Sequence, residues 1–209
     1  MTRALAAAPD AITAACFVVL WVAPFALGVG GVRNAMLVML VEFILMHAAG
    51  ALGGIVFAER TTRTRRLVSI AGMGMFYLVF VGSFALAFKA WWPFLAFGWL
   101  LVGKFVLAFD PARTPAQRRE QMMQRWGVTA LSYLLGVFVT VMVPLPRLGI
   151  TADVVPRLGL SGSGLWVEKP HTVIAFGAIY FGLLAWHALR QARAAAKAPA
   201  AAPPLSGSV

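Results

Sequence analysis

The sequence has few of the residues that stabilise small secreted domains or cover the surface of soluble ones. Its 209 residues include one cysteine, Cys16, so no disulfide can form within the chain and no cluster of cysteines can hold a metal. Only 12% of the residues are charged, against about 25% in soluble domains, while 61% are hydrophobic. This composition excludes an ordinary soluble domain and indicates an integral membrane protein.

The positive charge of the chain is distributed over short loops. The sequence has 18 Lys and Arg residues and a formal net charge of +11. These residues fall between apolar runs rather than along one face, which favours contact with lipid headgroups and a fixed topology over binding to nucleic acid. Membrane lipids are therefore the expected partners, and nucleic acid is not.

Six apolar runs come near the roughly 20 residues that a helix needs to cross about 30 Å of hydrocarbon. They cover residues 11–32, 34–58, 67–88, 90–109, 126–143 and 172–189. We therefore predict an all-α polytopic membrane protein, a six-transmembrane-helix bundle in a single domain over residues 1–190. Residues 191–209 are rich in alanine and proline and poor in large apolar side chains, which predicts a disordered cytoplasmic tail.

Lys and Arg residues also predict the orientation of the bundle. Most of them follow the second, fourth and sixth runs, and the loops of the opposite side hold only Arg33, Lys89, Arg147, Arg157 and Lys169. By the positive-inside rule, the arginine-rich side is cytoplasmic, which places both termini in the cytoplasm of a multi-pass protein of the cell inner membrane. On that side, residues 110–125 predict a short separate helix that begins at Pro115.

The second run is the most informative stretch, because it carries Glu42 and His47 inside the predicted span. Ionisable side chains are costly in hydrocarbon and mark functional sites there. The two residues are five apart, about 140° round a helix, so they do not share a face. Glu42 is expected to bind a proton or a cation. The alternative is a neutral carboxyl that is hydrogen-bonded for structure alone.

All three tyrosines of the chain, Tyr77, Tyr133 and Tyr180, fall at mid-depth in predicted spans. Tyrosine usually prefers the interface between membrane and water. Hydroxyl groups at the level of Glu42 would satisfy its carboxyl and form a polar layer in the bundle. The alternative is that each tyrosine fills the core and bonds to a backbone carbonyl.

Two histidines and two glycines suggest further roles. His47 and His187 fall at similar predicted depths on different helices, and a pair of imidazoles is one way to hold a haem or another metal centre. A protein without a cofactor is the favoured expectation, with haem as the alternative. Gly50 and Gly54 form a GxxxG pattern, which predicts close helix packing, within the chain, with membrane-protein partners or in a homo-oligomer.

The longest connection between runs, residues 144–171, contains the sequence Pro-Arg-Leu-Gly twice, at 146–149 and 156–159. Its prolines and apolar side chains predict a segment that lies on the mouth of the bundle. A lid that gates the mouth and a cover without a gating role are the two interpretations.

Together these features predict handling of a ligand rather than a chemical reaction, and no residue is assigned as catalytic. The expected function is ion- or proton-linked transport of a small substrate at a polar site around Glu42. A non-enzymatic structural or assembly subunit of a larger membrane complex is the first alternative. A haem- or metal-binding redox protein is the second.

Overall fold

The fold is that of a computed structural model, which describes residues 7–56, 62–98, 101 and 115–197. All regular elements within these ranges are helices, which confirms the predicted all-α class. The elements are α2 (Ala8–Val22), α3 (Gly31–Val56), α4 (Arg63–Ala87), α6 (Pro115–Met142), the 3₁₀ helix η1 (Val155–Leu158), α7 (Leu165–Glu168) and α8 (Pro170–Lys197), with a further helical stretch over residues 92–98.

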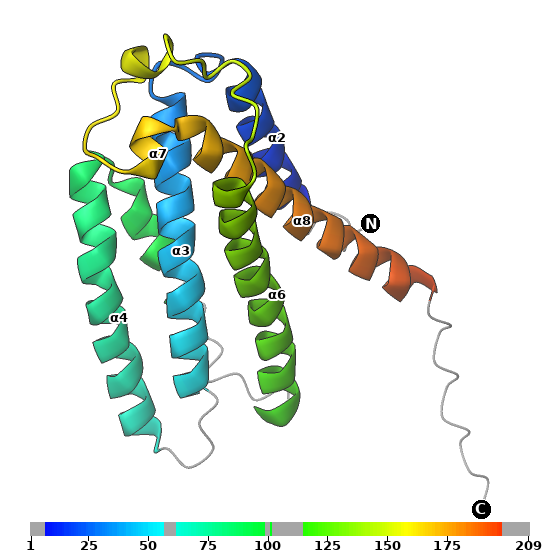
Figure 1. Cartoon of the computed structure of the whole chain (residues 1–209). Helices are drawn as coiled ribbons and strands as arrows, with labels where there is room; N and C mark the ends of the chain where they lie inside the picture. The colour runs from blue at the N-terminus through cyan, green and yellow to red at the C-terminus, as the bar shows by residue number, and fades with distance from the viewer. Residues whose placement is uncertain (1–6, 57–61, 99–100, 102–114, 198–209) are drawn as a thin grey trace, which may run out of the picture.

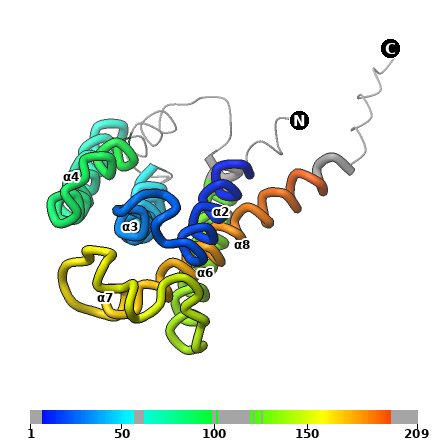
Figure 2. The backbone as a smooth tube through the Cα atoms, turned by 90° about the horizontal axis from the view of Figure 1, so that it is seen from above, coloured from blue at the N-terminus to red at the C-terminus, as the bar shows by residue number. Residues whose placement is uncertain are grey.

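Helices α3, α4 and α6 run side by side along one axis, and α8 crosses them obliquely (Figure 1). The C-terminal half of α8 extends away from the other helices, and α2 packs along α8 (Figure 2). Contacts link α3 to α2, α4, α6 and α8. The second predicted span is therefore the central helix of the bundle.

Four helices are long and apolar enough to cross a membrane. They are α3, α4, the part Met122–Met142 of α6 and the part Pro170–Ala194 of α8. Large apolar side chains cover their outward faces, among them Phe76 and Phe80 of α4 and Leu131 and Phe138 of α6. Such continuous apolar faces suit hydrocarbon rather than water. The helices therefore indicate membrane association, and four helices among the described residues have the length and composition of a span.

The first predicted span, residues 11–32, is not one continuous helix. The helix α2 ends at Val22, and residues 23–30 form turns. Pro24 has no N–H group with which to continue the helix, and Gly28 takes a φ of +89° in the turn. At about 1.5 Å per residue, the 15 residues of α2 give only about 22 Å of helix.

The helix α6 joins two elements that the sequence predicts separately. It has no break between Pro115 and Met142, so the described part of the predicted short helix, 115–125, and nearly all of the fifth span, 126–143, belong to one helix. Residues 110–114 lie outside the described residues. Its first described residue is Pro115, and proline tolerates the first helical position. No proline follows before residue 144, so nothing interrupts the passage from the arginine-rich turns into the apolar span.

The helix α8 is also longer than the predicted sixth span, 172–189. It continues to Lys197 through a run of alanines, which have the highest helix propensity. The helix therefore enters the expected tail 191–209, of which residues 198–209 lie outside the described residues. The predicted fourth span, 90–109, also lies outside them after residue 98, except for residue 101.

Buried side chains form two clusters on different sides of α3. The larger one lies among α2, α3, α6 and α8 and includes Phe17 and Phe176. The other lies among α3, α4 and residues 92–98 and includes Leu52 and Ile70. Because α3 contributes to both clusters, it has few positions that face away from the protein, and it holds the two halves of the bundle together.

Residues 143–169, which we call the outer segment, connect α6 to α8. They pack on the end of the bundle at which α3 and α8 begin (Figure 1). Ile150 and Leu158 of this segment are buried in the larger cluster. The segment therefore lies on the mouth of the bundle, as its sequence predicts.

The outer segment is tied to the end of α2 by its backbone. The Gly149 N–H donates to the Trp21 carbonyl over 3.0 Å, and the Trp21 indole N–H donates to the Pro146 carbonyl over 3.0 Å. A Cβ at position 149 would collide with the carbonyl group of Val22. Only glycine allows the two backbones to approach this closely.

Gly177 provides a test of the packing between α2 and α8. A Cβ at this position would overlap the ring of Phe17, which is only 2% exposed and has no room to move aside. We expect Gly177→Ala to lower the free energy of unfolding by about 1–3 kcal/mol, the usual cost of overpacking. The measurement is the thermal midpoint of the purified protein in detergent.

Gly182 is the matched control on the same helix. Nothing lies within 4 Å of its Cβ position, and alanine has a higher helix propensity than glycine. Gly182→Ala should leave the thermal midpoint unchanged or raise it. Equal midpoints for the two alanine variants would contradict the described packing of α2 on α8.

Candidate functional site

The central polar contact joins α3 to α8. The Tyr180 hydroxyl donates a hydrogen bond to Oε1 of Glu42 over 2.7 Å. Tyr180 is fully buried, and Glu42 is half-buried. A hydrogen bond of this length to a carboxyl oxygen belongs to the stronger class in proteins. Glu42 therefore has the hydroxyl partner that its place in the predicted span requires.

Glu42 and Tyr180 both lie near the middle of the membrane-spanning parts of their helices. At about 1.5 Å per residue, Glu42 lies about 17 Å along α3 from its first residue. Tyr180 lies about 15 Å along α8 from its first residue by the same measure. Each distance is about half of a 30 Å hydrocarbon core, so the bond belongs to the interior of the span rather than to its ends.

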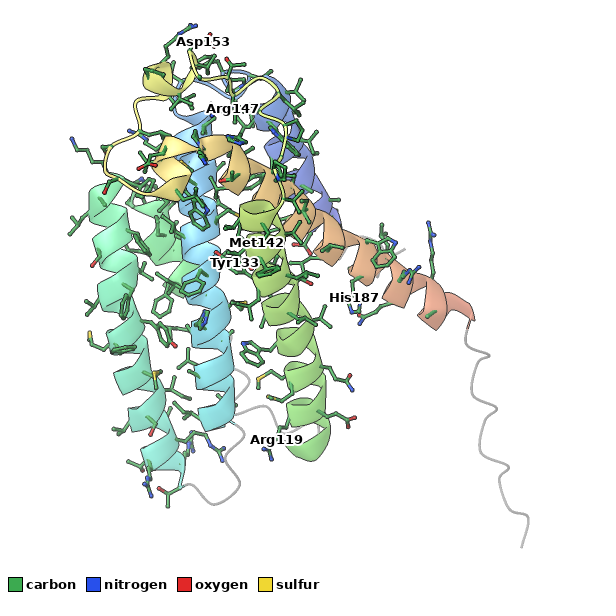
Figure 3. All side chains as sticks on the ribbon, viewed as in Figure 1. Arg119, Tyr133, Met142, Arg147, Asp153 and His187 are labelled. Carbon is green, nitrogen blue, oxygen red and sulfur yellow. The ribbon has the colours of Figure 1, made fainter. Side chains whose placement is uncertain are left out.

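Tyr133 of α6 borders this contact without bonding to Glu42. Its hydroxyl donates to the backbone carbonyl of Met39 over 3.0 Å, nearly one turn before Glu42 on α3. Its ring packs edge to face against Tyr180, with 5.3 Å between the ring centroids. Figure 3 shows Tyr133 between α6 and α3. Tyr133 thus bonds to the backbone, as in the alternative interpretation, and its ring helps to hold Tyr180 in place.

Tyr77 lies apart from this group. It belongs to α4, is half-buried, and packs on the cluster between α3 and α4, with its ring against Phe76. The structure therefore brings two of the three predicted tyrosines to Glu42. The number of residues along a helix predicts how deep a side chain lies but not the direction in which it points. Tyr77 therefore lies outside the site, although its predicted depth is similar to that of Glu42.

A second carboxyl, that of Asp10, accompanies Glu42. Asp10 lies in the first turn of α2, and its charge acts on both Glu42 and Tyr180. The sequence prediction missed it, because the predicted first span begins one residue later. Pro9 could have indicated that the helix includes Asp10. Proline is common in the first turn of a helix, and α2 indeed begins at Ala8, before Asp10.

His47 and His187, the two histidines considered as haem ligands, each contact a residue of their own helix. His47 lies on the exposed face of α3, where its Nδ1 is 2.8 Å from the Phe43 carbonyl oxygen and its ring packs against the Phe43 ring. His187 has its Nε2 2.9 Å from the amide nitrogen of Gln191. No three His, Cys, Asp or Glu side chains converge as a metal site within the described part of the chain.

The glycine-rich face of α3 packs on α6. The Trp126 ring occupies the space that a Cβ at Gly50 would need, and the Trp126 indole N–H donates to the Met46 carbonyl over 3.0 Å. Gly53 is equally close to α6, whereas nothing lies within 4 Å of a Cβ at Gly54. Gly50 and Gly53 therefore pack against α6 within the chain, whereas Gly54 does not.

The chain matches no protein-family model, no curated protein and no solved structure. The site combines a carboxyl and a hydroxyl that are hydrogen-bonded between α3 and α8 with a second carboxyl from α2. Oxygen ligands of this kind can hold a proton or a hard cation.

The bond between Tyr180 and Glu42 predicts energetic coupling between the two side chains. Tyr180→Phe leaves the carboxyl without its donor and should cost about 1–3 kcal/mol of stability. In a Glu42→Leu background the same change should cost less, because no carboxyl is left to satisfy. A double-mutant cycle of thermal unfolding in detergent should give a coupling energy of about 0.5–3 kcal/mol.

Tyr133→Phe is the control for this cycle. Its hydroxyl bonds to the Met39 carbonyl and not to Glu42, so its cost should be nearly the same in both backgrounds. If Glu42 were coupled to Tyr133 as strongly as to Tyr180, the assigned hydrogen bond would be wrong.

Proposed function

We propose that the protein is an inner-membrane protein whose site around Glu42 binds a proton or a cation, in ion- or proton-linked transport of a small substrate. The observation that carries this proposal is the hydrogen bond from Tyr180 to Glu42 in the middle of two membrane-length helices. An ionisable side chain at such a place is costly, and it is retained where function requires it.

The composition of the site supports a binding role for the carboxyl. The Tyr180 hydroxyl can donate to Glu42 whether the acid is neutral or charged. Asp10 adds a second carboxyl whose charge acts on Glu42. Two negative charges repel in a medium of low dielectric constant, and a proton or cation bound at Glu42 removes this repulsion.

The groups of the site come from two sets of helices, and this arrangement supports a coupling between binding and helix movement. Glu42 belongs to the central helix α3, whereas Tyr180 and Asp10 belong to the oblique pair α8 and α2 (Figures 1 and 2). Binding or release of a positive charge therefore acts between two sets of helices. A local change of charge of this kind can shift the balance between two packing arrangements.

The proposed topology has six spans with both termini in the cytoplasm. The beginning of α3, the end of α4 and the outer segment carry Arg33, Lys89 and Arg147 at one end of the bundle. The opposite end carries the arginine-rich beginning of α4, including Arg63 and Arg65. This bias supports a cytoplasmic location for the end at which α4 begins.

A structural or assembly subunit of a larger membrane complex is the second candidate. Gly54 favours it, because this residue is exposed on α3 and nothing lies within 4 Å of its Cβ position. A glycine on an open helix face lets the helix of a membrane-protein partner, or of a second copy, approach closely.

Glu42→Gln tests the proposed function. Glutamine keeps the size and hydrogen-bonding capacity of the side chain but does not titrate. We expect the thermal midpoint of the wild-type protein in detergent to depend on pH between about 4 and 8 or on added Na⁺ or K⁺. The midpoint of Glu42→Gln should lose this dependence while the protein still folds and inserts.

Glu168→Gln is the matched control, because Glu168 is an exposed carboxyl in α7. This variant should keep the dependence of the wild type on pH and cations. Superimposable profiles for wild type and Glu42→Gln would refute the binding role of Glu42.

Cysteine labelling tests the topology. In a Cys16→Ala background, Ser161→Cys in the outer segment should react with an impermeant thiol reagent in intact cells. Thr62→Cys, just before α4, should react only after lysis, because the positive-inside rule places it in the cytoplasm. Both positions are exposed in the structure. Reaction of Thr62→Cys in intact cells would overturn the assignment.

A further inference from the structure

His171 is buried at the beginning of α8 with one ring nitrogen unused. It is the second residue of the helix and is 6% exposed. Its Nδ1 atom is buried and has no hydrogen-bond partner among the residues that the structure describes. Buried polar atoms nearly always have a partner in folded proteins. The free nitrogen therefore points to a group that is not part of the described chain.

Two cationic side chains lie beside this imidazole. Arg147 and Lys169 are both exposed, and the charges of both act on His171. Figure 3 shows Arg147 in the outer segment, close to the first turns of α8. Within the described ranges, neither side chain has an ion-pair partner. Both charges that act on His171 within the described ranges are therefore positive.

Asp153, a carboxyl in the outer segment, interacts with residues other than Arg147. Thr151 donates a side-chain hydrogen bond to Asp153, and this bond, with a backbone hydrogen bond and the charge of Arg157, holds the pKa of Asp153 below its usual value. Asp153 lies at the tip of the segment, farther from α8 than Arg147 (Figure 3). It is therefore not the missing partner of the Arg147 guanidinium.

The helix itself adds to the positive potential at this place. The 28 residues of α8 present the positive end of their peptide dipoles at Pro170. The Cα–Cβ bonds of a helix tilt toward its N-terminus, so the Cα–Cβ bond of His171 leans toward the beginning of α8. Anions bind readily at helix N-termini when further donors are at hand.

We propose that His171, Arg147, Lys169 and the N-terminus of α8 form a binding site for a phosphate-type oxyanion at the outer mouth of the bundle. The imidazole donates Nδ1–H, the guanidinium offers a pair of parallel N–H groups, and the ammonium supplies a point charge. A phosphate group carries enough oxygen acceptors to accept from all three. The oxyanion comes either from a lipid headgroup or from free phosphate.

The site is tested on a protein in which His171 is the only histidine. The chain has three histidines, so His47→Gln with His187→Gln leaves a single imidazole to follow by NMR after labelling histidine with ¹⁵N. Inorganic phosphate is titrated in one arm, and phosphatidylglycerol in detergent micelles in the other. We expect the Nδ1 resonance of His171 to shift in a saturable way in at least one arm.

Lys169→Gln and Arg147→Gln should each weaken this binding about tenfold or more, since charge-assisted contacts contribute at this level. Both side chains are exposed, so the variants should fold as the wild type does, and each titration is compared with the resonance of the same variant without ligand. Lys89→Gln removes an exposed lysine from the same end of the bundle and should leave the affinity unchanged.

The two arms distinguish the sources of the oxyanion. A shift with inorganic phosphate only supports a soluble oxyanion, a shift with phosphatidylglycerol only supports a lipid headgroup, and a shift with both supports a site open to either. Absence of a shift in both arms, or equal weakening by Lys89→Gln, would overturn the proposal.

Discussion

A carboxyl group inside a bilayer needs a hydrogen-bond donor close by, and this need explains how the helices around Glu42 are arranged. The donor is Tyr180, which must come from another helix because the neighbours of Glu42 on α3 offer no hydroxyl. The contact therefore requires α8 to cross α3 at the level of Glu42. Tyr133 and Phe176 then pack around the Tyr180 ring and hold its hydroxyl in position. Removing water from this contact strengthens it, because no solvent competes for the carboxyl oxygen.

The prediction of the fold from the sequence succeeded where hydropathy alone decides the answer. The helical class and the central place of residues 34–58 follow from the length of the apolar runs. The limits of the helices were harder to predict. Residues 11–32 are apolar throughout, but Pro24 ends the helical hydrogen bonding inside them. Hydropathy measures preference for hydrocarbon, and it does not register a local break in backbone hydrogen bonds.

Counting residues along the predicted spans indicates which side chains share a level, but not which way they point. Glu42 and Tyr180 were expected at one level, and they are hydrogen-bonded. Tyr77 was expected there as well, but α4 contacts the opposite side of α3 and its tyrosine faces a different cluster. Which face of a helix meets which neighbour depends on close packing, such as that of Trp126 against Gly50. These contacts link residues far apart in the chain, and a single sequence contains no direct record of them.

The close approach of Gly149 to Val22 has a mechanical consequence. Two hydrogen bonds and a backbone contact fasten residues 146–149 of the outer segment to one end of α2. These residues cannot lift away from the bundle as a separate flap unless the two hydrogen bonds break. Because α2 itself packs along α8, any displacement that keeps the bonds has to carry α2 against that packing.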